Sequence, residues 1–160
     1  MNPAKTILVP EKKFIGVSFK MSFATHNPFM LWNKFMPRRH ELKNAIGSEL
    51  YSGEVYPPGF FDSYNPNALF NKWAAMQVSS FEDVPEGMET LTVPDSLYAI
   101  FIYKGNNAGA AAFYNKIFTE WLPSSEYTLD DRPHFAVMGA KYKKDDPDSE
   151  EEILIPVKKK

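Results

Sequence analysis

Apolar side chains alternate with small or polar ones over residues 14–23, which is the pattern of a β-strand with one buried face. Shorter runs of similar character predict strands at residues 50–56, 73–78, 91–93, 133–138 and 152–157. The run at residues 97–103 is apolar almost throughout, so we expect a central strand that is buried on both faces.

Two segments carry apolar residues at helical spacing. The first begins at a cap formed by Asn27, has Pro28 in its first turn, and extends to about Ile46. Pro37 lies inside this segment and is expected to kink the helix, because proline lacks the backbone N–H that an α-helix requires. The second spans about residues 110–122, and its apolar stripe predicts that it packs on the sheet.

Two further segments are predicted to be loops. Residues 60–71 are rich in Asn, Pro and aromatic side chains, which indicates an ordered loop of the kind that often covers a binding site. Phe60, Phe61 and Tyr64 are candidates for its lid. Residues 145–151 crowd carboxylates around a proline, which predicts a solvated hairpin loop.

The same order of elements occurs twice, about 82 positions apart. The segment Trp32-Asn33-Lys34-Phe35 is similar to Tyr114-Asn115-Lys116-Ile117-Phe118. At the same offset, the predicted strand at 51–56 is equivalent to the predicted strand at 133–138. We therefore expect one domain over residues 1–160, with pseudo-repeats at about 12–79 and 94–160. Duplicated β-α-β-β units predict an α+β fold with a two-fold sheet, and a cleft between its halves would suit a small molecule.

Composition narrows the class of protein. The chain has 160 residues, 44% of them hydrophobic, so it can bury a core without disulfides, and it contains no cysteine. Its net charge of −2 argues against nucleic-acid binding by this domain alone, which needs clustered Lys and Arg. The apolar run near the N-terminus is too short for a signal peptide or a membrane span. These features predict a cytoplasmic protein that does not enter a membrane.

Several familiar chemistries lack their residues in this sequence. His26, His40 and His134 have no metal-ligand spacing, so we expect no metal site. There is no Gly-x-Ser-x-Gly elbow of a serine hydrolase. The turn at residues 105–109 lacks the Lys-Ser/Thr pair of a phosphate loop, and the sequence predicts no cofactor.

The closing segment resembles a known family. The residues that carry the resemblance are Glu120-Trp121-Leu122-Pro123, Arg132-Pro133-His134-Phe135, Asp146-Pro147-Asp148-Ser149-Glu150 and Glu152-Ile153-Leu154-Ile155-Pro156-Val157. They are similar to the C-terminal signature of gyrase-inhibitor-like (GyrI-like) small-molecule-binding domains, which include effector-binding domains of AraC-type and multidrug-sensing activators. The resemblance implies a curved antiparallel sheet with two helices on one face and a ligand cleft on the other.

Ala136 departs from the pattern that the resemblance implies. Members of the family commonly carry Glu directly after the Pro-x-Phe of this strand, where the acid contacts a cation or, in a hydrolytic branch, assists the attack of water. Ala136 can do neither, which leaves either divergence toward a neutral ligand or a substitution that disables the site. The repeat places Glu54 at the equivalent position of the first half, so Glu54 is a possible substitute, and the catalytic residue stays unknown.

Candidate ligand-binding residues follow from strand faces, from the repeat and from the resemblance. Trp73 suits a cleft wall and a core equally, whereas Trp121 lies on the apolar stripe of the second helix, where a core position is more common, although the resemblance implies that the end of this helix bounds the cleft. Tyr98 is selected by its place at a strand start, and Glu152 is a weaker candidate acid. The predicted set is Glu54, Tyr56, Trp73, Tyr98, Trp121, His134, Ala136 and Met138.

The leading interpretation is a stand-alone small-molecule-binding protein whose partner is an apolar or cationic, drug-like ligand held in an aromatic cleft. The high aromatic content, 15% of residues, suits such a site. The first alternative, implied by the resemblance, is a hydrolase that detoxifies electrophilic cyclopropane-type compounds. The second is a protein-binding inhibitor module. Pairing of the chain with a second copy, as a homodimer, is left open.

Overall fold

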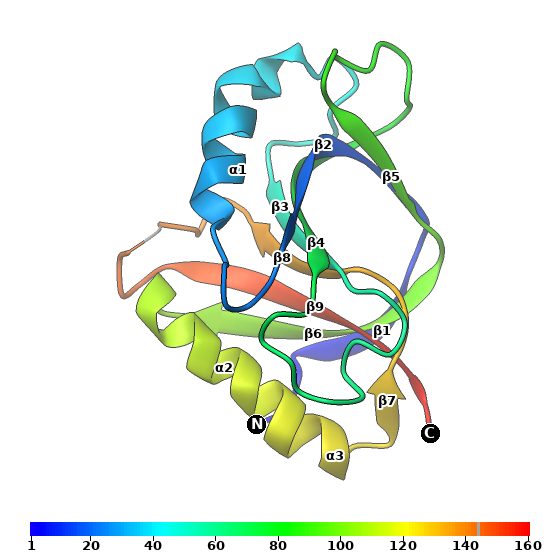
Figure 1. The fold of residues 1–160 in the computed structure, drawn as a ribbon, viewed down its shortest axis with the longest axis vertical. Coiled ribbons are helices and arrows are strands. Elements are labelled where there is room, and N and C mark those ends of the chain that lie inside the picture. The colour runs from blue at the N-terminus through cyan, green and yellow to red at the C-terminus, as the bar shows by residue number, and fades with distance from the viewer. Residues whose placement is uncertain (144) are drawn as a thin grey trace.

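The chain folds into a strongly curved antiparallel sheet with helices on one face (Figure 1). The computed structural model describes residues 1–143 and 145–160. Within these described residues, nine strands form the sheet: eight run in the order β1-β6-β9-β8-β3-β4-β2-β5, and β7 pairs with β9 beside this path. Their bounds are β1 Lys5–Val9, β2 Lys12–Met21, β3 Leu50–Val55, β4 Phe70–Val78, β5 Glu89–Val93, β6 Ser96–Lys104, β7 Tyr127–Leu129, β8 His134–Met138 and β9 Glu150–Lys159.

The helical segments are shorter and less regular than their apolar stripes predict. α1 spans Pro28–Phe35 and continues as a 3₁₀ turn, η1, over Met36–Glu41. The helix predicted to reach Ile46 is therefore α-helical only to Phe35, because Pro37 cannot donate the next α-helical hydrogen bond, and its 3₁₀ continuation ends at Glu41. The second helix confirms its predicted span; it consists of the 3₁₀ turn η2 Asn107–Gly109, α2 Ala110–Lys116, the π-helical turn η3 Ile117–Trp121 and α3 Leu122–Ser124.

Two hydrophobic cores attach the helices to one face of the sheet. Leu31 and Phe35 of α1 pack on the first half, against side chains of β2 and β4 such as Ile15 and Met76. Ile117 and Trp121 of the second helix pack on the other half. The partners there are Ala99, Phe101, Tyr103, Ile153, Ile155 and Val157 from β6 and β9. The prediction of an antiparallel α+β fold with two helices is confirmed.

The opposite face of the sheet is closed by its own side chains. Phe14 stacks on Phe135 with ring centroids 5.0 Å apart, and Tyr51 stands edge-on to Phe14 at 4.8 Å. Trp73, Tyr98, Ile100 and Leu154 complete this core, and the space left beside it is about 10 Å³, no more than one water molecule needs. The expected cleft is therefore absent from this face of the described residues, because aromatic side chains fill it.

Two short connections between strands explain why the sheet is curved. β1 is at one end of the sheet but passes into β2, near the other end, through only Pro10 and Glu11. β5 passes into β6 in the same way through Pro94 and Asp95, and the Glu11 amide donates a hydrogen bond to the Asp95 carboxylate at 2.7 Å. These links bring the two ends of the sheet together, so its inner face packs against itself.

The two halves of the sheet join along β3 and β8. Gly53 pairs with Phe135, which is the residue 82 positions further along the chain. On either side of this pair, Ser52 lies opposite Ala136 and Glu54 lies opposite His134. The register supports the proposed duplication, with an approximate two-fold axis through the Gly53–Phe135 pair. It also brings Glu54 and His134 side by side at one end of the seam.

We predict that Gly16→Ala lowers the free energy of unfolding by about 3 kcal/mol, toward the upper end for an overpacked site. Gly16 lies in β2 between β4 and β5, and a Cβ added there would sit 2.1 Å from the Ala74 carbonyl oxygen and 2.7 Å from the Ala75 Cα. Because these atoms belong to the backbone, β2 and β4 would have to separate. Urea unfolding followed by circular dichroism measures the change.

Gly139→Ala is the matched control, because its added Cβ would meet nothing closer than the Glu49 Cγ at 3.7 Å. Equal stabilities of the two variants would contradict the prediction, because they would show that β2 can accommodate a Cβ at Gly16 without strain.

Candidate functional site

A cavity of about 440 Å³ opens on the helix-bearing face of the protein. It lies between the chain that follows β3, the end of the second helix and the chain from β7 to β8, and its size is typical of small-molecule sites. Four aromatic residues line it: Tyr56, Phe60, Phe61 and Phe118. Its polar residues include Asp62, Asp130, Asp131, Arg132 and His134.

Strand register explains why these residues meet. β3 runs out at Val55, directly before Tyr56, and β8 begins with His134, so both side chains leave the same end of the β3–β8 seam. Even-numbered positions of these two strands point toward the helices, as Leu50 and Ala136 do in the two helix-side cores. Phe118, in the π-helical turn η3, places its ring beside His134 at the same end of the β3–β8 seam.

His134 is enclosed by aromatic rings. The Tyr56 ring stands edge-on to it with centroids 4.9 Å apart, and the rings of Phe61 and Phe118 lie at 5.9 and 6.0 Å. Phe61 and Phe118 also stack on each other at 5.7 Å. Burial lowers the pKa of His134 to about 3, so its imidazole is uncharged at neutral pH. Burial likewise raises the pKa of the Tyr56 hydroxyl well above its usual value.

A polar cluster lies on the sheet between the two helices. The Lys72 Nζ donates to the Glu54 Oε1 at 3.0 Å, and both side chains are largely buried. Burial raises the pKa of Glu151. The nearby negative charge of Glu54 raises this pKa further, whereas the positive charge of Lys72 lowers it. Burial raises the pKa of Tyr114 far above its usual value, and Glu54 and Glu151 add to this effect. The cluster pairs two carboxylates with one ammonium group.

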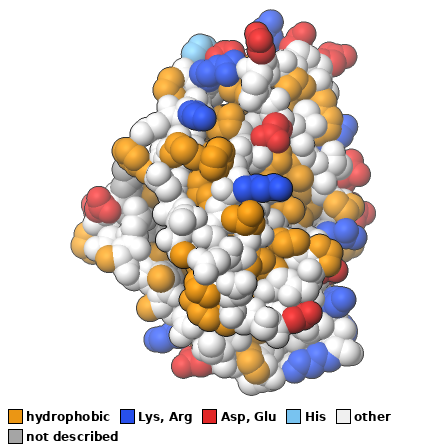
Figure 2. Space-filling model, in the orientation of Figure 1, with side chains coloured by type: hydrophobic (Ala, Val, Ile, Leu, Met, Phe, Trp, Pro, Cys, Tyr) orange, Lys and Arg blue, Asp and Glu red, His pale blue; other side chains and the backbone are white. Residues whose placement is uncertain are grey.

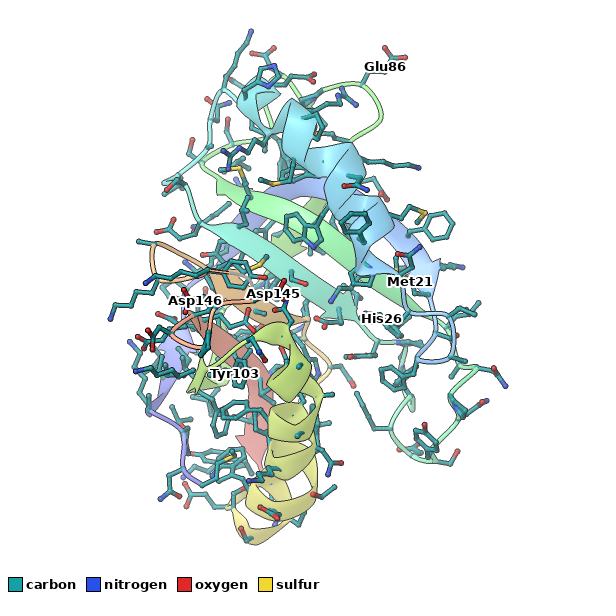
Figure 3. All side chains as sticks on the ribbon, turned by 90° about the vertical axis from the view of Figure 1, so that its left-hand side faces the viewer. Met21, His26, Glu86, Tyr103, Asp145 and Asp146 are labelled. Carbon is teal, nitrogen blue, oxygen red and sulfur yellow. The ribbon has the colours of Figure 1, made fainter. Side chains whose placement is uncertain are left out.

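The part of the sheet that carries this polar cluster lies between the two helices. Figure 3 shows α1 and α2 over the same face, one above the other, and His26 near the lower end of α1. Burial and the charge of Lys72 lower the pKa of His26, which places it within electrostatic reach of the cluster. In Figure 2, hydrophobic side chains spread over the middle of the face shown and charged ones gather mainly around its outline.

Two general features bear on the class of protein. In the part of the chain that the structure describes, no helix is both long and apolar enough to cross a bilayer. Among the same residues, His, Asp and Glu side chains form no group of three or more that could hold a metal ion.

Comparison with known proteins now decides the family. The model of the GyrI-like small molecule binding domain matches residues 5–158, which is nearly the whole chain. The chain belongs to the GyrI-like family. Among curated proteins it is similar to the transcriptional regulator BrlR of Pseudomonas aeruginosa, with 25% identity over 155 residues. That match covers 96% of this chain and 55% of BrlR, so the chain spans about half the length of its curated relative.

Solved structures share the fold of this GyrI-like domain. SAV2435 bound to tetraphenylphosphonium has a TM-score of 0.70 at 14% identity, over 96% of this chain and 93% of that one. The EcmrR C-terminal domain has a TM-score of 0.69 at 16% identity, over 98% and 97%. A hydrolase encoded by lin2189 from Listeria innocua has a TM-score of 0.62 at 14% identity, over 98% and 92%.

Five of the eight predicted site residues share the helix-bearing side of the β3–β8 seam: Glu54, Tyr56, His134, Ala136 and Met138. Only Tyr56 and His134 line the cavity, and Met138 lies opposite Leu50 at the other end of the seam. Of the predicted lid, Phe60 and Phe61 line the cavity, whereas Tyr64 is exposed and outside its lining.

Three predicted site residues lie elsewhere. Trp121 packs in the second helical core, edge-on to Phe101 with centroids 5.1 Å apart. Trp73 and Tyr98 point to the opposite face, where both are buried, and the Tyr98 hydroxyl donates a hydrogen bond to the Pro133 carbonyl at 2.7 Å. Their strands present the alternate residues to the helices, so these two rings stabilise the curved sheet and lie away from the cavity.

Sequence reasoning passed over Lys72, Phe118 and Glu151, which the structure places beside Glu54 or at the cavity. Glu152 is exposed, whereas its neighbour Glu151 is half-buried and shares the helix-facing side with Ile153 and Ile155. The alternation of apolar residues along β9 carries this signal, because it places odd-numbered positions inward. Lys72 shows no such signal, since a single Lys in an apolar strand is identified only by its pairing with Glu54 in the folded protein.

We predict that His134 makes the protein less stable in acid. The unfolded chain binds a proton at this residue below about pH 6.5, whereas the folded protein binds it only near pH 3, so stability is full above pH 6.5 and falls toward pH 3. The slope due to His134 approaches about 1.4 kcal/mol per pH unit in this window. His134→Gln should remove it, as measured by urea unfolding from pH 3.5 to pH 7.

The exposed His40 supplies the control, because His40→Gln should leave the pH dependence of wild type unchanged. Glu151, whose pKa is raised, contributes a slope of opposite sign in all three proteins and cancels in the comparison. Parallel pH profiles of His134→Gln and wild type would contradict the prediction.

Proposed function

We propose that this domain binds a small molecule with an apolar, ring-based body, neutral or cationic, in the cavity beside His134. The observation that carries the proposal is the wall of four aromatic rings around about 440 Å³ of space. Aromatic faces bury flat apolar groups and attract cations, each cation contact contributing about 0.5 to 2 kcal/mol. A site built this way gains most of its affinity from the shape and area of the ligand.

Charge at the cavity favours cations over anions. Three carboxylates, those of Asp62, Asp130 and Asp131, line it together with one guanidinium, that of Arg132. On the sheet, Ala136 carries no charge and the carboxylate of Glu54 is compensated by Lys72. The negative charge near the ligand therefore comes from carboxylates at the cavity rim and not from an acid at position 136. Solvent and salt at the rim weaken the attraction between these carboxylates and a cation. We infer that a cation binds here but that positive charge is not required.

We predict that tetraphenylphosphonium binds saturably and at least about tenfold more tightly than tetraphenylborate, an anion of the same shape. The rim carboxylates attract the cation and repel the borate, and about 1.4 kcal/mol corresponds to a tenfold change. Phe61→Ala should weaken tetraphenylphosphonium binding about tenfold, because it removes one stacked wall of the cavity. Isothermal titration calorimetry measures both effects.

Phe29→Ala is the matched control, since Phe29 is the same residue type, is exposed on α1 and is not among the residues that line the cavity. Its affinity should equal that of wild type. Absence of saturable binding by both salts would contradict a cation site here and would leave a neutral ligand or a protein partner as the alternatives.

A second candidate is hydrolysis of electrophilic cyclopropane-type compounds. This reaction would need an acid at position 136, where Ala136 lies two residues from His134 on the helix-facing side of β8, opposite Ser52. A glutamate side chain there would join the layer that holds Glu54 and Glu151, the kind of environment that raises the pKa of an acid and suits proton transfer.

We predict that Ala136→Glu tightens tetraphenylphosphonium binding about tenfold without producing turnover, because it adds a partly desolvated negative charge beside the cavity. Ala136→Gln is the isosteric control and should leave this affinity near that of wild type. Product formation from a cyclopropane-containing electrophile by Ala136→Glu, and not by wild type or Ala136→Gln, would instead establish the hydrolytic function.

A further inference from the structure

His134 is a buried polar side chain for which the fold supplies no hydrogen-bond partner. It is 5% exposed, yet within residues 1–143 and 145–160 no hydrogen bond joins either of its ring nitrogens to another residue. Among the described residues, the only fully buried side-chain nitrogen or oxygen without a hydrogen-bond partner is the Trp73 Nε1. The His134 ring nitrogens therefore keep some accessible surface, which they have because the side chain lines the cavity.

The surroundings of the ring explain why the protein itself cannot satisfy it. Tyr56, Phe61 and Phe118 contact the imidazole through their rings, which supply no conventional hydrogen-bond acceptor or donor. Glu54, its partner across the seam, already binds Lys72. The remaining side of the imidazole faces the cavity, which His134 lines. Its ring nitrogens can therefore bond only to something that enters the cavity.

We propose that His134 is a specificity-determining residue, whose imidazole forms a hydrogen bond with an uncharged polar group of the ligand. The preferred ligand is then a neutral aromatic compound that carries one hydroxyl or similar group, of the phenol class. The inference rests on the proposed function and deepens it, because it names the polar contact that aromatic walls alone cannot provide.

The chemistry of the imidazole fits such a group. A neutral imidazole has one N–H donor and one acceptor nitrogen, so a phenol can donate to it or accept from it. Its low pKa keeps this hydrogen-bonding pattern throughout the neutral range. An anionic ligand could accept a hydrogen bond from the single N–H of the neutral imidazole but would be repelled by the carboxylates of Asp62, Asp130 and Asp131. A cation such as tetraphenylphosphonium has no atom that could form the hydrogen bond.

The test uses 1-naphthol and naphthalene, which differ by one hydroxyl. In His134→Phe, which keeps a ring but no hydrogen-bonding atom, the affinity for 1-naphthol should fall about tenfold, as the loss of one buried hydrogen bond implies. The affinity for naphthalene should stay within about twofold of wild type. His134→Gln, which restores a donor and an acceptor, should recover most of the 1-naphthol affinity. Equilibrium fluorescence titration of each probe gives these values.

A second measurement on wild type does not depend on any variant folding. With ¹⁵N-labelled histidine, the ring-nitrogen resonances of His134 should shift when 1-naphthol is added and move much less with naphthalene. His40→Phe, at an exposed histidine, should bind both probes as wild type does. Thermal unfolding of His134→Phe verifies that this variant is folded.

The outcomes separate this inference from the proposed function. An equal loss of affinity for both probes in His134→Phe, or no loss for 1-naphthol, overturns the role of His134 while leaving the cavity a binding site. Binding of tetraphenylphosphonium but of neither naphthalene probe also overturns it. If none of the three compounds binds, the proposed function fails and this inference fails with it.

Discussion

The antiparallel pairing of β3 with β8 is the contact on which the rest of the structure depends. Gly53 permits it, since a Cβ at this position would lie 3.0 Å from the Phe135 ring, which instead packs over the bare backbone and stacks on Phe14. The pairing fixes which residues face the helices. A slip by one residue would turn Glu54 and His134 into the aromatic core of the opposite face, where their polar groups would be unpaired.

The same seam separates two kinds of electrostatic environment. On the sheet between the helices, the Lys72 ammonium pairs with the Glu54 carboxylate, and this attraction offsets part of the cost of burying both charges. At the end of the seam, aromatic rings surround an uncharged imidazole, and carboxylates occur only on the connecting segments around it. If the proposed function holds, Ala136 in place of an acid makes discrimination between ligands depend on shape and hydrogen bonding more than on a central charge.

Sequence patterns predicted most strands, the span of the second helix and the family, because alternation and helical spacing are local. They did not predict β1, or the end of the first helix at Glu41, since short edge strands and 3₁₀ turns carry weak signals. Alternation divides a strand into two faces without saying which face meets the helices, so Trp73 and Tyr98 were assigned to the site while Glu151 was passed over. Those choices depend on long-range pairing, which one sequence does not display.

The two proline-containing links at residues 10–11 and 94–95 have a consequence for how such a domain can diversify. They lock the curved sheet around an aromatic interior that the cavity does not share, whereas the walls of the cavity pack on the two helix-side cores. The walls and rim of the cavity come largely from connecting segments and from one helix end. Substitutions there exchange one ligand preference for another without disturbing strand register, which makes this architecture readily evolvable for recognition of new molecules.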